Sequence, residues 1–362
     1  MDKIRIFATC DIGQAALDRL REKGWKVEVW DQFEAPPYEV VLEKVRSGVD
    51  VLITTLRDRI DEEVFRTGCG KLKLVAQDAV GYDNIDRTAA NRYRVPFTHT
   101  PDVLTHATAE FALFLLGSAA RKLGPSEELV RTGRWKTWHP YLPFLGVEVT
   151  GKTVAVIGTG RIGKAFAGKC LGLDVDLLLY DARPDPQFSS RLARLAEERH
   201  SLGLASRLCR VEYVEPDRAL READFVSLHL PLTEDTRHFL NRERLGWMRR
   251  EAVVVNTSRG AVVDEVALAE ALRDGRIAGA ALDVFETEPL PLDSPLLAPE
   301  LKEKVRVFHH FASGTVETRL SSDPDRGMAG RCVQAVINLL EGRYGGDPGR
   351  MPWVVNKEAF RD

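Results

Sequence analysis

A short apolar run followed by three closely spaced glycines constrains the fold of this chain more than any other feature. Thr153 to Ile157 is apolar and β-branched, as a parallel strand covered on both faces requires, and Lys164 to Leu171 has helical spacing. Gly158 allows a tight turn, Gly160 lets the backbone approach a pyrophosphate, and Gly163 lets the helix lie against the strand. The N–H groups at the start of the helix would then point at phosphate.

An acidic residue closes the next strand, which runs from Leu177 to Asp181. A carboxylate at this position can accept hydrogen bonds from an adenosine ribose diol and would repel a 2′-phosphate. A plain strand-to-helix turn also uses glycines, but the glycines, strands and Asp181 together favour a dinucleotide site. We expect NAD rather than NADP, although Arg183, two residues later, weakens that preference.

Length and composition limit the remaining possibilities. With 362 residues the chain is long for one core, so two domains are expected. A net charge of −3 provides no basic footprint for nucleic acid or a membrane surface. The five cysteines lack the close pairs of zinc or redox motifs, so we expect no metal. The start of the chain has no signal-peptide pattern and no apolar run reaches about 18 residues, which predicts a cytoplasmic protein.

The first hundred residues alternate between strand and helix patterns, as a doubly wound parallel sheet does. Ligands of such sheets lie at the carboxyl ends of strands, which here are Leu56-Arg57 and Ala79-Val80-Gly81. A buried helix is predicted from Thr105 to Lys122. The aromatic segment Gly133–Tyr141 that follows can pack into the protein's own core or form a subunit interface.

The second half continues the same alternation. The polar segment Arg183–Pro216 contains a predicted extra helix at Ser189–Glu198, to which we assign no function. The last helix is predicted from about Asp325 to Glu341, with Asp323 as its N-cap and Pro324 as its first residue.

Three loops at strand ends in this half carry reactive groups. They are Asn256–Gly260, Asp283–Pro289 and His309–Thr315. Reduction of a 2-oxo acid needs a cation for the carboxylate and carbonyl oxygen and a proton donor for the developing alkoxide. Arg259 can be the cation and a histidine the acid, with a carboxylate favouring the imidazolium. Taken singly, the arginine, Glu286, Glu288 and the histidine are ordinary surface or packing residues. Their joint placement after a cofactor motif favours catalysis.

The sequence resembles the D-isomer-specific 2-hydroxyacid dehydrogenases from about residue 3 to 357. The resemblance rests on Ala79–Asp86, Thr100–Thr105, Ala109-Glu110, the glycine motif, Val255–Asp264, Gly279–Pro289 and His310–Ser313. It implies a catalytic triad of Arg259, Glu288 and His310, in which Glu288 and not Glu286 has the catalytic position. It also implies that the nicotinamide lies near Asp283 and the substrate carboxylate near the Val80 and Gly81 amides.

The resemblance implies a wider set of binding residues. For the cofactor these are Thr108, Gly158, Gly160, Arg161, Ile162, Gly163, Asp181, Pro231, Thr257, Ser258, Arg259, Asp283, His310 and Ser313. For the substrate they are Leu56, Val80, Gly81, Arg259 and Trp138 of the partner subunit.

Within the family the sequence looks most like the glyoxylate and hydroxypyruvate reductases. Trp135–Pro140 with Phe144-Leu145-Gly146 resembles their dimer arm, which implies a homodimer. The alternatives are another specificity (D-lactate, D-3-phosphoglycerate or phosphite) and, outside enzymes, a nicotinamide-sensing regulator similar to a corepressor. The sequence departs from the family at His309, where proline is usual, at the inserted Ser321–Arg326 and at the long Arg183–Pro216.

The expected architecture is α/β, with two doubly wound parallel-sheet domains. A flavodoxin-like substrate domain, residues 1–100 completed by 320–362, would join a Rossmann domain, residues 101–319. The active site would lie in the cleft between them, and closure of the domains would exclude water.

Overall fold

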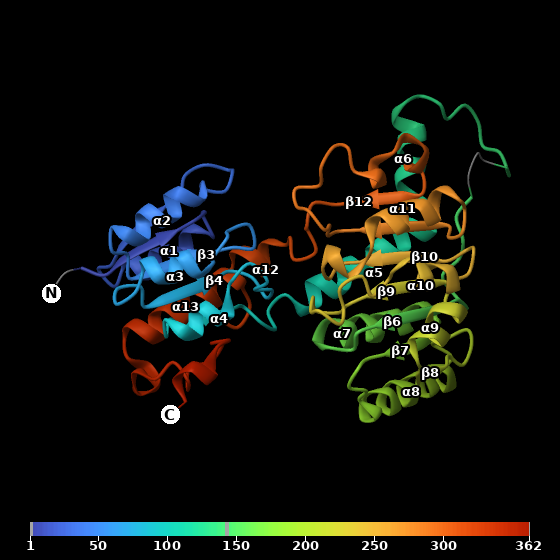
Figure 1. Ribbon diagram of the computed structural model, residues 1–362. Helices are drawn as coiled ribbons and strands as arrows, with labels where there is room; N and C mark the ends of the chain where they lie inside the picture. The colour runs from blue at the N-terminus through green and yellow to red at the C-terminus, as the bar shows by residue number, and fades with distance from the viewer. Residues whose placement is uncertain (1–2, 142–144, 362) are drawn as a thin grey trace. The chain divides into compact units, whose positions relative to one another are not determined.

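The computed structural model describes residues 3–141 and 145–361 (Figure 1). Phe144, which belongs to the predicted dimer arm, therefore lies outside the described residues. So do residues 1, 2 and 362, at the two ends of the predicted substrate domain. The chain divides into two compact units, unit 1 (Met1–Leu104 with Ser313–Asp362) and unit 2 (Thr105–Ala312). It thus passes from one unit to the other twice.

Unit 1 contains five parallel strands in the order β2-β1-β3-β4-β5. The strands are β1 (Arg5–Ala8), β2 (Lys26–Val29), β3 (Val51–Thr54), β4 (Leu74–Gln77) and β5 (Phe97–Thr98). This is the strand order of flavodoxin-like doubly wound sheets, so the predicted fold class is confirmed for this unit.

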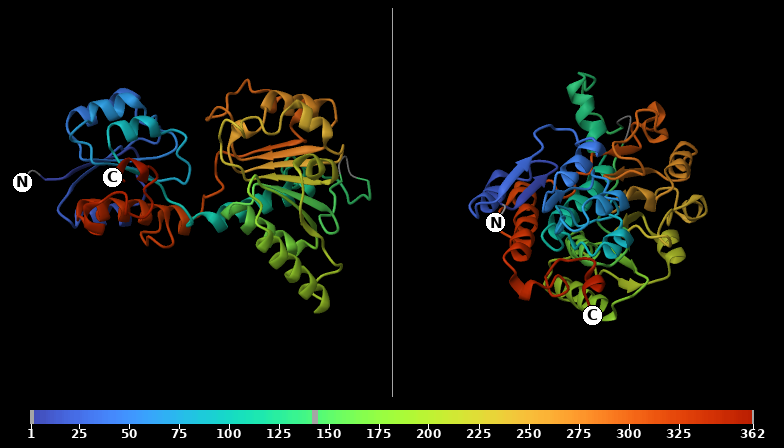
Figure 2. Two further views of the ribbon diagram at one scale, coloured as in Figure 1. Left: turned by 60° about the horizontal axis from the view of Figure 1, so that its bottom comes forward. Right: turned by 60° about the vertical axis from the view of Figure 1, so that its left-hand side comes forward.

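Helices cover both faces of this sheet because successive strand residues point to opposite sides (Figure 2). Ile6 and Ala8 belong to one core, and Phe7, between them, belongs to the other. The first core is completed by α1 (Gln14–Arg21) and α13 (Met328–Leu340), the second by α2 (Tyr38–Arg46), α3 (Glu62–Thr67) and α4 (Arg87–Arg92). Asp61 is the N-cap of α3, since its side chain accepts a hydrogen bond from the Glu63 amide.

The last long helix begins later than predicted. The chain turns from Asp323 to Gly327, where the Asp323 carbonyl accepts from the Gly327 amide at 2.9 Å, and Gly327 is the N-cap of α13. A Cβ on Gly330 would lie 2.5 Å from the Asp323 carbonyl carbon, so this turn packs directly on the first turn of the helix. The predicted cap at Asp323 is wrong because a tertiary contact outweighs a local cap pattern. The short helix α12 (Val316–Leu320) precedes the turn.

Unit 2 contains seven parallel strands in the order β12-β11-β10-β9-β6-β7-β8. They are β6 (Thr153–Ile157), β7 (Asp176–Tyr180), β8 (Val211–Tyr213), β9 (Phe225–Leu228), β10 (Val253–Asn256), β11 (Gly279–Leu282) and β12 (Val305–Val307). From β6 the chain adds β7 and β8 on one side, and it then returns to add β9 to β12 on the other side. Dinucleotides bind in Rossmann folds at such a switch point, here between β6 and β9. The predicted Rossmann architecture is confirmed.

Two cores flank the sheet of unit 2. α5 (Thr105–Ala120), α7 (Arg161–Cys170) and α8 (Pro186–Ser201) cover one face. α9 (Pro216–Glu222), α10 (Arg242–Trp247) and α11 (Glu265–Arg273) cover the other. The predicted helix after the glycines is confirmed, but it starts three residues earlier, at Arg161, directly after the turn.

The long polar segment after Asp181 is part of the Rossmann fold. The predicted extra helix is α8, which begins after an N-cap at Asp185 and joins β7 to β8. Sequence patterning missed β8 because its three residues are all half-buried and show no alternation. The segment therefore supplies an edge strand and its crossover helix.

A second missed element, the helix α6, precedes the aromatic segment. α5 ends at Ala120, since Lys122 is left-handed (φ 53°), and α6 (Leu123–Arg131) follows. Beyond α6 the segment drawn in green in Figure 1 continues without helix or strand through Tyr141. Trp138 and Tyr141 are each 80% exposed.

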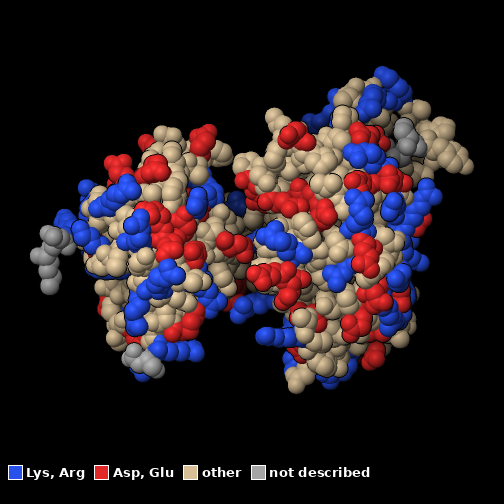
Figure 3. Space-filling model, viewed as in Figure 1, with Lys and Arg blue, Asp and Glu red and all other residues tan. Residues whose placement is uncertain are grey.

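Charges of both signs are interspersed on the face of each unit shown in Figure 3. Across residues 3–141 and 145–361, no helix combines the length and apolar character that crossing a bilayer requires. All five cysteines are free thiols.

Candidate active site

The glycine turn has the close packing that its sequence predicts. A Cβ on Gly163 would lie 1.9 Å from the Gly158 carbonyl oxygen, and one on Gly158 would lie 2.8 Å from the His229 backbone. Gly158 also has φ +96°, which favours glycine. A Cβ on Gly160 would meet no atom within 4 Å, so the backbone is open at the N-terminus of α7. This geometry fits a pyrophosphate held by amides of the turn.

Asp181 is held by the same turn. Its Oδ2 accepts from the Thr159 amide at 2.7 Å and the Thr159 hydroxyl at 3.2 Å, and its Oδ1 accepts from the Arg183 amide at 2.9 Å. The Thr159 hydroxyl also contacts the Tyr213 hydroxyl of β8 at 2.8 Å. The carboxylate is therefore oriented before any ribose binds. Sequence reasoning missed Thr159, which lies between the first two glycines of the motif, and Tyr213, which lies in the missed strand β8.

The loop after β10 is organised by a residue to which we assigned no role. The buried Asn256 donates to the Arg259 carbonyl at 2.9 Å and accepts from the Ser258 amide and hydroxyl at 3.0 and 2.8 Å. The Arg259 guanidinium donates to the Ser258 carbonyl at 2.7 Å. The Thr257 hydroxyl is buried, and none of the described residues hydrogen-bonds to it. A polar ligand at this strand end would satisfy that hydroxyl.

A glycine brings this loop against the next one. A Cβ on Gly260 would lie 1.8 Å from the Phe285 carbonyl carbon, so the two backbones touch at a point that only glycine permits. The loop after β11 is thereby fixed beside Arg259, and it carries Glu288.

Glu288 and His310 form a hydrogen-bonded pair. His310 Nδ1 lies 2.8 Å from Glu288 Oε2, and Glu288 Oε1 accepts from the Phe285 amide at 3.0 Å. Burial alone would raise the pKa of Glu288, but the hydrogen bond and charge of His310, with the Phe285 amide and Arg259, lower it overall. The carboxylate is thus charged at neutral pH. Because a carboxylate only accepts, it fixes the proton on Nδ1.

Glu286 lies in a different environment. Its Oε1 accepts from the Glu265 amide at the start of α11, and its Oε2 is 3.2 Å from His238 Nε2. The structure therefore pairs His310 with the second of the two glutamates.

Asp283 holds the histidine loop in place. Its two carboxylate oxygens accept from the Phe311 and Ala312 amides at 2.7 and 2.8 Å, and its carbonyl accepts from the His310 amide at 2.8 Å. Burial raises the pKa of Asp283, although the two amides oppose that effect. Its side chain supports the loop directly, a role not anticipated from the sequence.

The backbone at His310 is not extended. His310 has φ +56°, a left-handed conformation that is uncommon for a residue with a side chain. His309 has different surroundings from His310: it is exposed, and its ring packs on Phe311 with centroids 5.2 Å apart.

The remaining predicted residues, apart from Trp138 and Ser313, occupy strand ends or helix starts. Unit 2 contains Thr108 in α5, Arg161 and Ile162 in α7, and Pro231 after β9. Unit 1 contains Leu56 after β3, Val80 and Gly81 after β4, and Ser313, whose hydroxyl accepts from Arg319 at 3.1 Å. Trp138 is in the exposed segment after α6, in unit 2.

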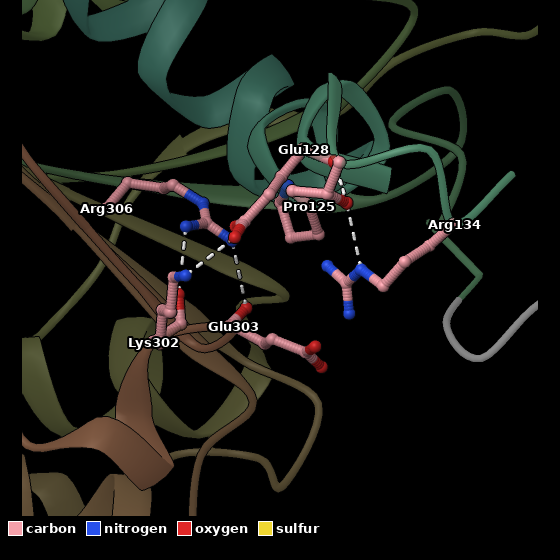
Figure 4. Close-up of a pocket in the computed structure, with 7 residues that line it drawn as sticks. Pro125, Glu128, Arg134, Lys302, Glu303 and Arg306 are labelled. Atoms are coloured by element: carbon pink, nitrogen blue, oxygen red, sulfur yellow. Dashed lines mark hydrogen bonds and ion pairs between the residues drawn. The ribbon is translucent and has the colours of Figure 1, made fainter. Parts of the chain in front are cut away.

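A pocket of about 210 Å³ lies away from these residues, beside α6 (Figure 4). Lys302 Nζ contacts Glu128 Oε1 at 2.7 Å, and Arg306 donates to the Lys302 and Glu303 carbonyls. Lys302 and Arg306 are thus engaged by other groups of the protein, so we assign this pocket no role in catalysis. Among the described residues, no group of three or more His, Cys, Asp or Glu is placed to hold a metal ion.

Comparison with known proteins gives one consistent result. The family model described as "D-isomer specific 2-hydroxyacid dehydrogenase, NAD binding domain" matches residues 113–312. The chain is 43% identical to a glyoxylate reductase of Korarchaeum cryptofilum, covering 99% of this chain and 98% of that protein. It is 41% identical to a glyoxylate reductase of Aeropyrum pernix, covering 100% and 98%. A crystal structure of a Thermus thermophilus protein, 38% identical, matches 97% of this chain and 100% of its own with a TM-score of 0.82.

Proposed function

The chain belongs to the D-isomer-specific 2-hydroxyacid dehydrogenase family, and from that premise we propose that it reduces glyoxylate or hydroxypyruvate to the 2-hydroxy acid. The product has the D configuration where it is chiral. The observation that carries the proposal is the 2.8 Å contact between His310 and Glu288, in the same unit as the glycine turn and Arg259. The full-length relatives are named glyoxylate reductases, which favours an enzyme over a nicotinamide-sensing regulator.

A bound nicotinamide cofactor would supply the hydride, and the turn at Gly158–Gly163 with Asp181 would hold it. Arg259 binds the substrate carboxylate and polarises the carbonyl oxygen, which carries the developing negative charge. His310 gives that oxygen a proton from Nε2, because Nδ1 is directed at Glu288. Glu288 stabilises the imidazolium. The Val80 and Gly81 amides bind the substrate carboxylate.

A panel of 2-oxo acids, assayed by loss of reduced-nicotinamide absorbance, tests the proposal; a wild-type protein that turns over none of them would refute it.

We expect NADH to be preferred to NADPH. Asp181 is held at the end of β7 by the Thr159 and Arg183 amides, so it cannot turn away from a 2′-phosphate without losing them. A tenfold preference for NADH corresponds to a free-energy difference of only about 1.4 kcal/mol. The repulsion between the Asp181 carboxylate and a 2′-phosphate in contact with it readily exceeds that value. The measurement is kcat/KM for each cofactor, with Asp181→Ser as the variant in which the ratio should shrink. Preference of the wild-type enzyme for NADPH would contradict the assignment.

We also propose a homodimer in which the segment from Trp135 to Tyr141 is covered by the second copy. Trp135, Trp138 and Tyr141 are 57%, 80% and 80% exposed, an apolar surface that association would bury. Light scattering at micromolar concentration should give twice the chain mass. Trp138→Ala should raise KM for the substrate, whereas Phe33→Ala, which removes another highly exposed ring, should not. A stable monomer would refute the dimer, and an unchanged KM would remove Trp138 from the site.

A further inference from the structure

The loop that follows β4 is fixed by three interior hydrogen bonds to consecutive carbonyl groups. The Ala79 carbonyl accepts from the Thr100 amide at 2.8 Å. The Val80 carbonyl lies 3.0 Å from His99 Nδ1, and the Gly81 carbonyl accepts from Gln77 Nε2 at 3.3 Å. Backbone and side chain donors thus hold every peptide plane from Ala79 to Tyr82.

Fixing the carbonyls also fixes the amides. In a planar trans peptide the N–H points opposite to the C=O, and the bonds of this loop are trans. The N–H groups of Val80, Gly81 and Tyr82 are therefore each directed away from an interior donor. Within the described part of the chain, no hydrogen bond engages these three amides. Successive amides of this kind bind anions.

Gln77 links this loop to the neighbouring one. It is fully buried, and its Oε1 accepts from the Thr54 hydroxyl at 2.7 Å. Its Nε2 also donates to Asn84 Oδ1 at 2.8 Å, and Asn84 donates to the carbonyls of Thr55 and Asp58 at 3.0 and 2.7 Å. One amide network therefore sets both the loop that contains Leu56 and the loop that contains Val80.

His99 anchors the other side of the loop. Its amide donates to the Trp353 carbonyl at 3.2 Å, and its ring meets the Tyr82 ring edge-on with centroids 5.7 Å apart. Because a carbonyl can only accept, Nδ1 must carry the hydrogen that holds Val80. The ring therefore acts as a donor at a defined position.

We propose that Gln77 and His99 are positioning residues for the substrate carboxylate: they orient the Val80, Gly81 and Tyr82 amides without contacting the substrate. This inference rests on the proposed reduction of a 2-oxo acid. An amide that is already oriented binds the carboxylate without the entropic cost of ordering the loop. Loss of either side chain should weaken substrate binding and leave the chemistry in unit 2 largely unchanged.

The test compares substitutions that remove each donor with ones that keep it. Gln77→Met preserves length but cannot hydrogen-bond as an amide, and His99→Leu removes the ring donor. KM for the 2-oxo acid should rise about 10- to 100-fold, as expected for loss of bonds to a charged ligand, with kcat and KM for NADH changing less than about threefold. His99→Asn should restore most of the affinity, since its amide nitrogen can occupy the position of Nδ1.

The matched control is Gln14→Met, the same exchange at an exposed site on α1 of the same unit. It should leave all constants unchanged. Melting curves verify that each variant folds. If Gln77→Met does not fold, the comparison of His99→Leu with His99→Asn tests the proposal. An unchanged substrate KM in the folded variants, equal loss in His99→Leu and His99→Asn, or parallel loss of NADH affinity would each overturn the proposal. A wild-type protein inactive on every 2-oxo acid would instead refute the proposed function.

Discussion

His310→Ala is expected to lower kcat for 2-oxo acid reduction by roughly 10²- to 10⁴-fold, the contribution of a general acid, while His309→Ala changes it by less than about threefold. The two side chains are adjacent in sequence but differ in their surroundings. His310 is hydrogen-bonded to Glu288 and held by the Asp283 carbonyl, whereas His309 is exposed and packs on Phe311.

Steady-state kinetics of both variants at several pH values would measure this difference. His309→Ala is a matched control because it makes the same chemical change one residue away. Cofactor affinity of His310→Ala, followed by NADH fluorescence, separates loss of the acid from loss of the loop structure. If His309→Ala proved the more damaging, the proton donor would have to be reassigned.

Glu288→Gln is expected to remove a large part of the contribution of His310 to kcat at neutral pH. It should also move the upper pH limit of reduction downward. Glu288 is an anion there because the hydrogen bond and charge of His310 outweigh the effect of burial and lower its pKa. Glutamine keeps the shape but not the charge, so it no longer stabilises the imidazolium that supplies the proton. Since reduction needs that proton, activity should begin to fall at lower pH than in the wild type.

The pH profile of kcat/KM for reduction shows the effect directly. The control is Glu286→Gln, two residues earlier, whose carboxylate serves α11 and His238 and not His310. Its profile should overlay the wild type. A Glu288→Gln profile with an unmoved upper limit would mean that Glu288 does not stabilise the protonated acid.

The sequence predicted features that depend on residue type at a fixed local spacing. Gly158 and Gly163 were predicted because only glycine allows the close approach of turn, helix and strand, and the short distances that a Cβ at either position would make bear this out. The fold class followed from alternating strand and helix patterns, and the strand orders confirm it.

Contacts between distant segments could not be predicted in the same way. Asn256 and Gln77 have no periodic signal, and their importance depends on which backbone groups the fold brings to them. The start of α13 was misplaced because Gly330 packs against a turn that looked like a cap. Likewise, nothing near His310 in sequence indicates its left-handed backbone, which is supported by Asp283, the residue directly after the neighbouring strand β11.

The division of unit 1 into two chain segments has a consequence for the order in which the protein is made. α13 provides Ala329, Cys332, Val333, Val336 and Ile337 to the core formed by β1, β3 and β4. These residues leave the ribosome after all of unit 2, which is continuous in sequence. During synthesis one face of the first sheet therefore has only part of its apolar cover, from α1, while unit 2 can already fold. The core on this face is therefore closed only after α13 has been made.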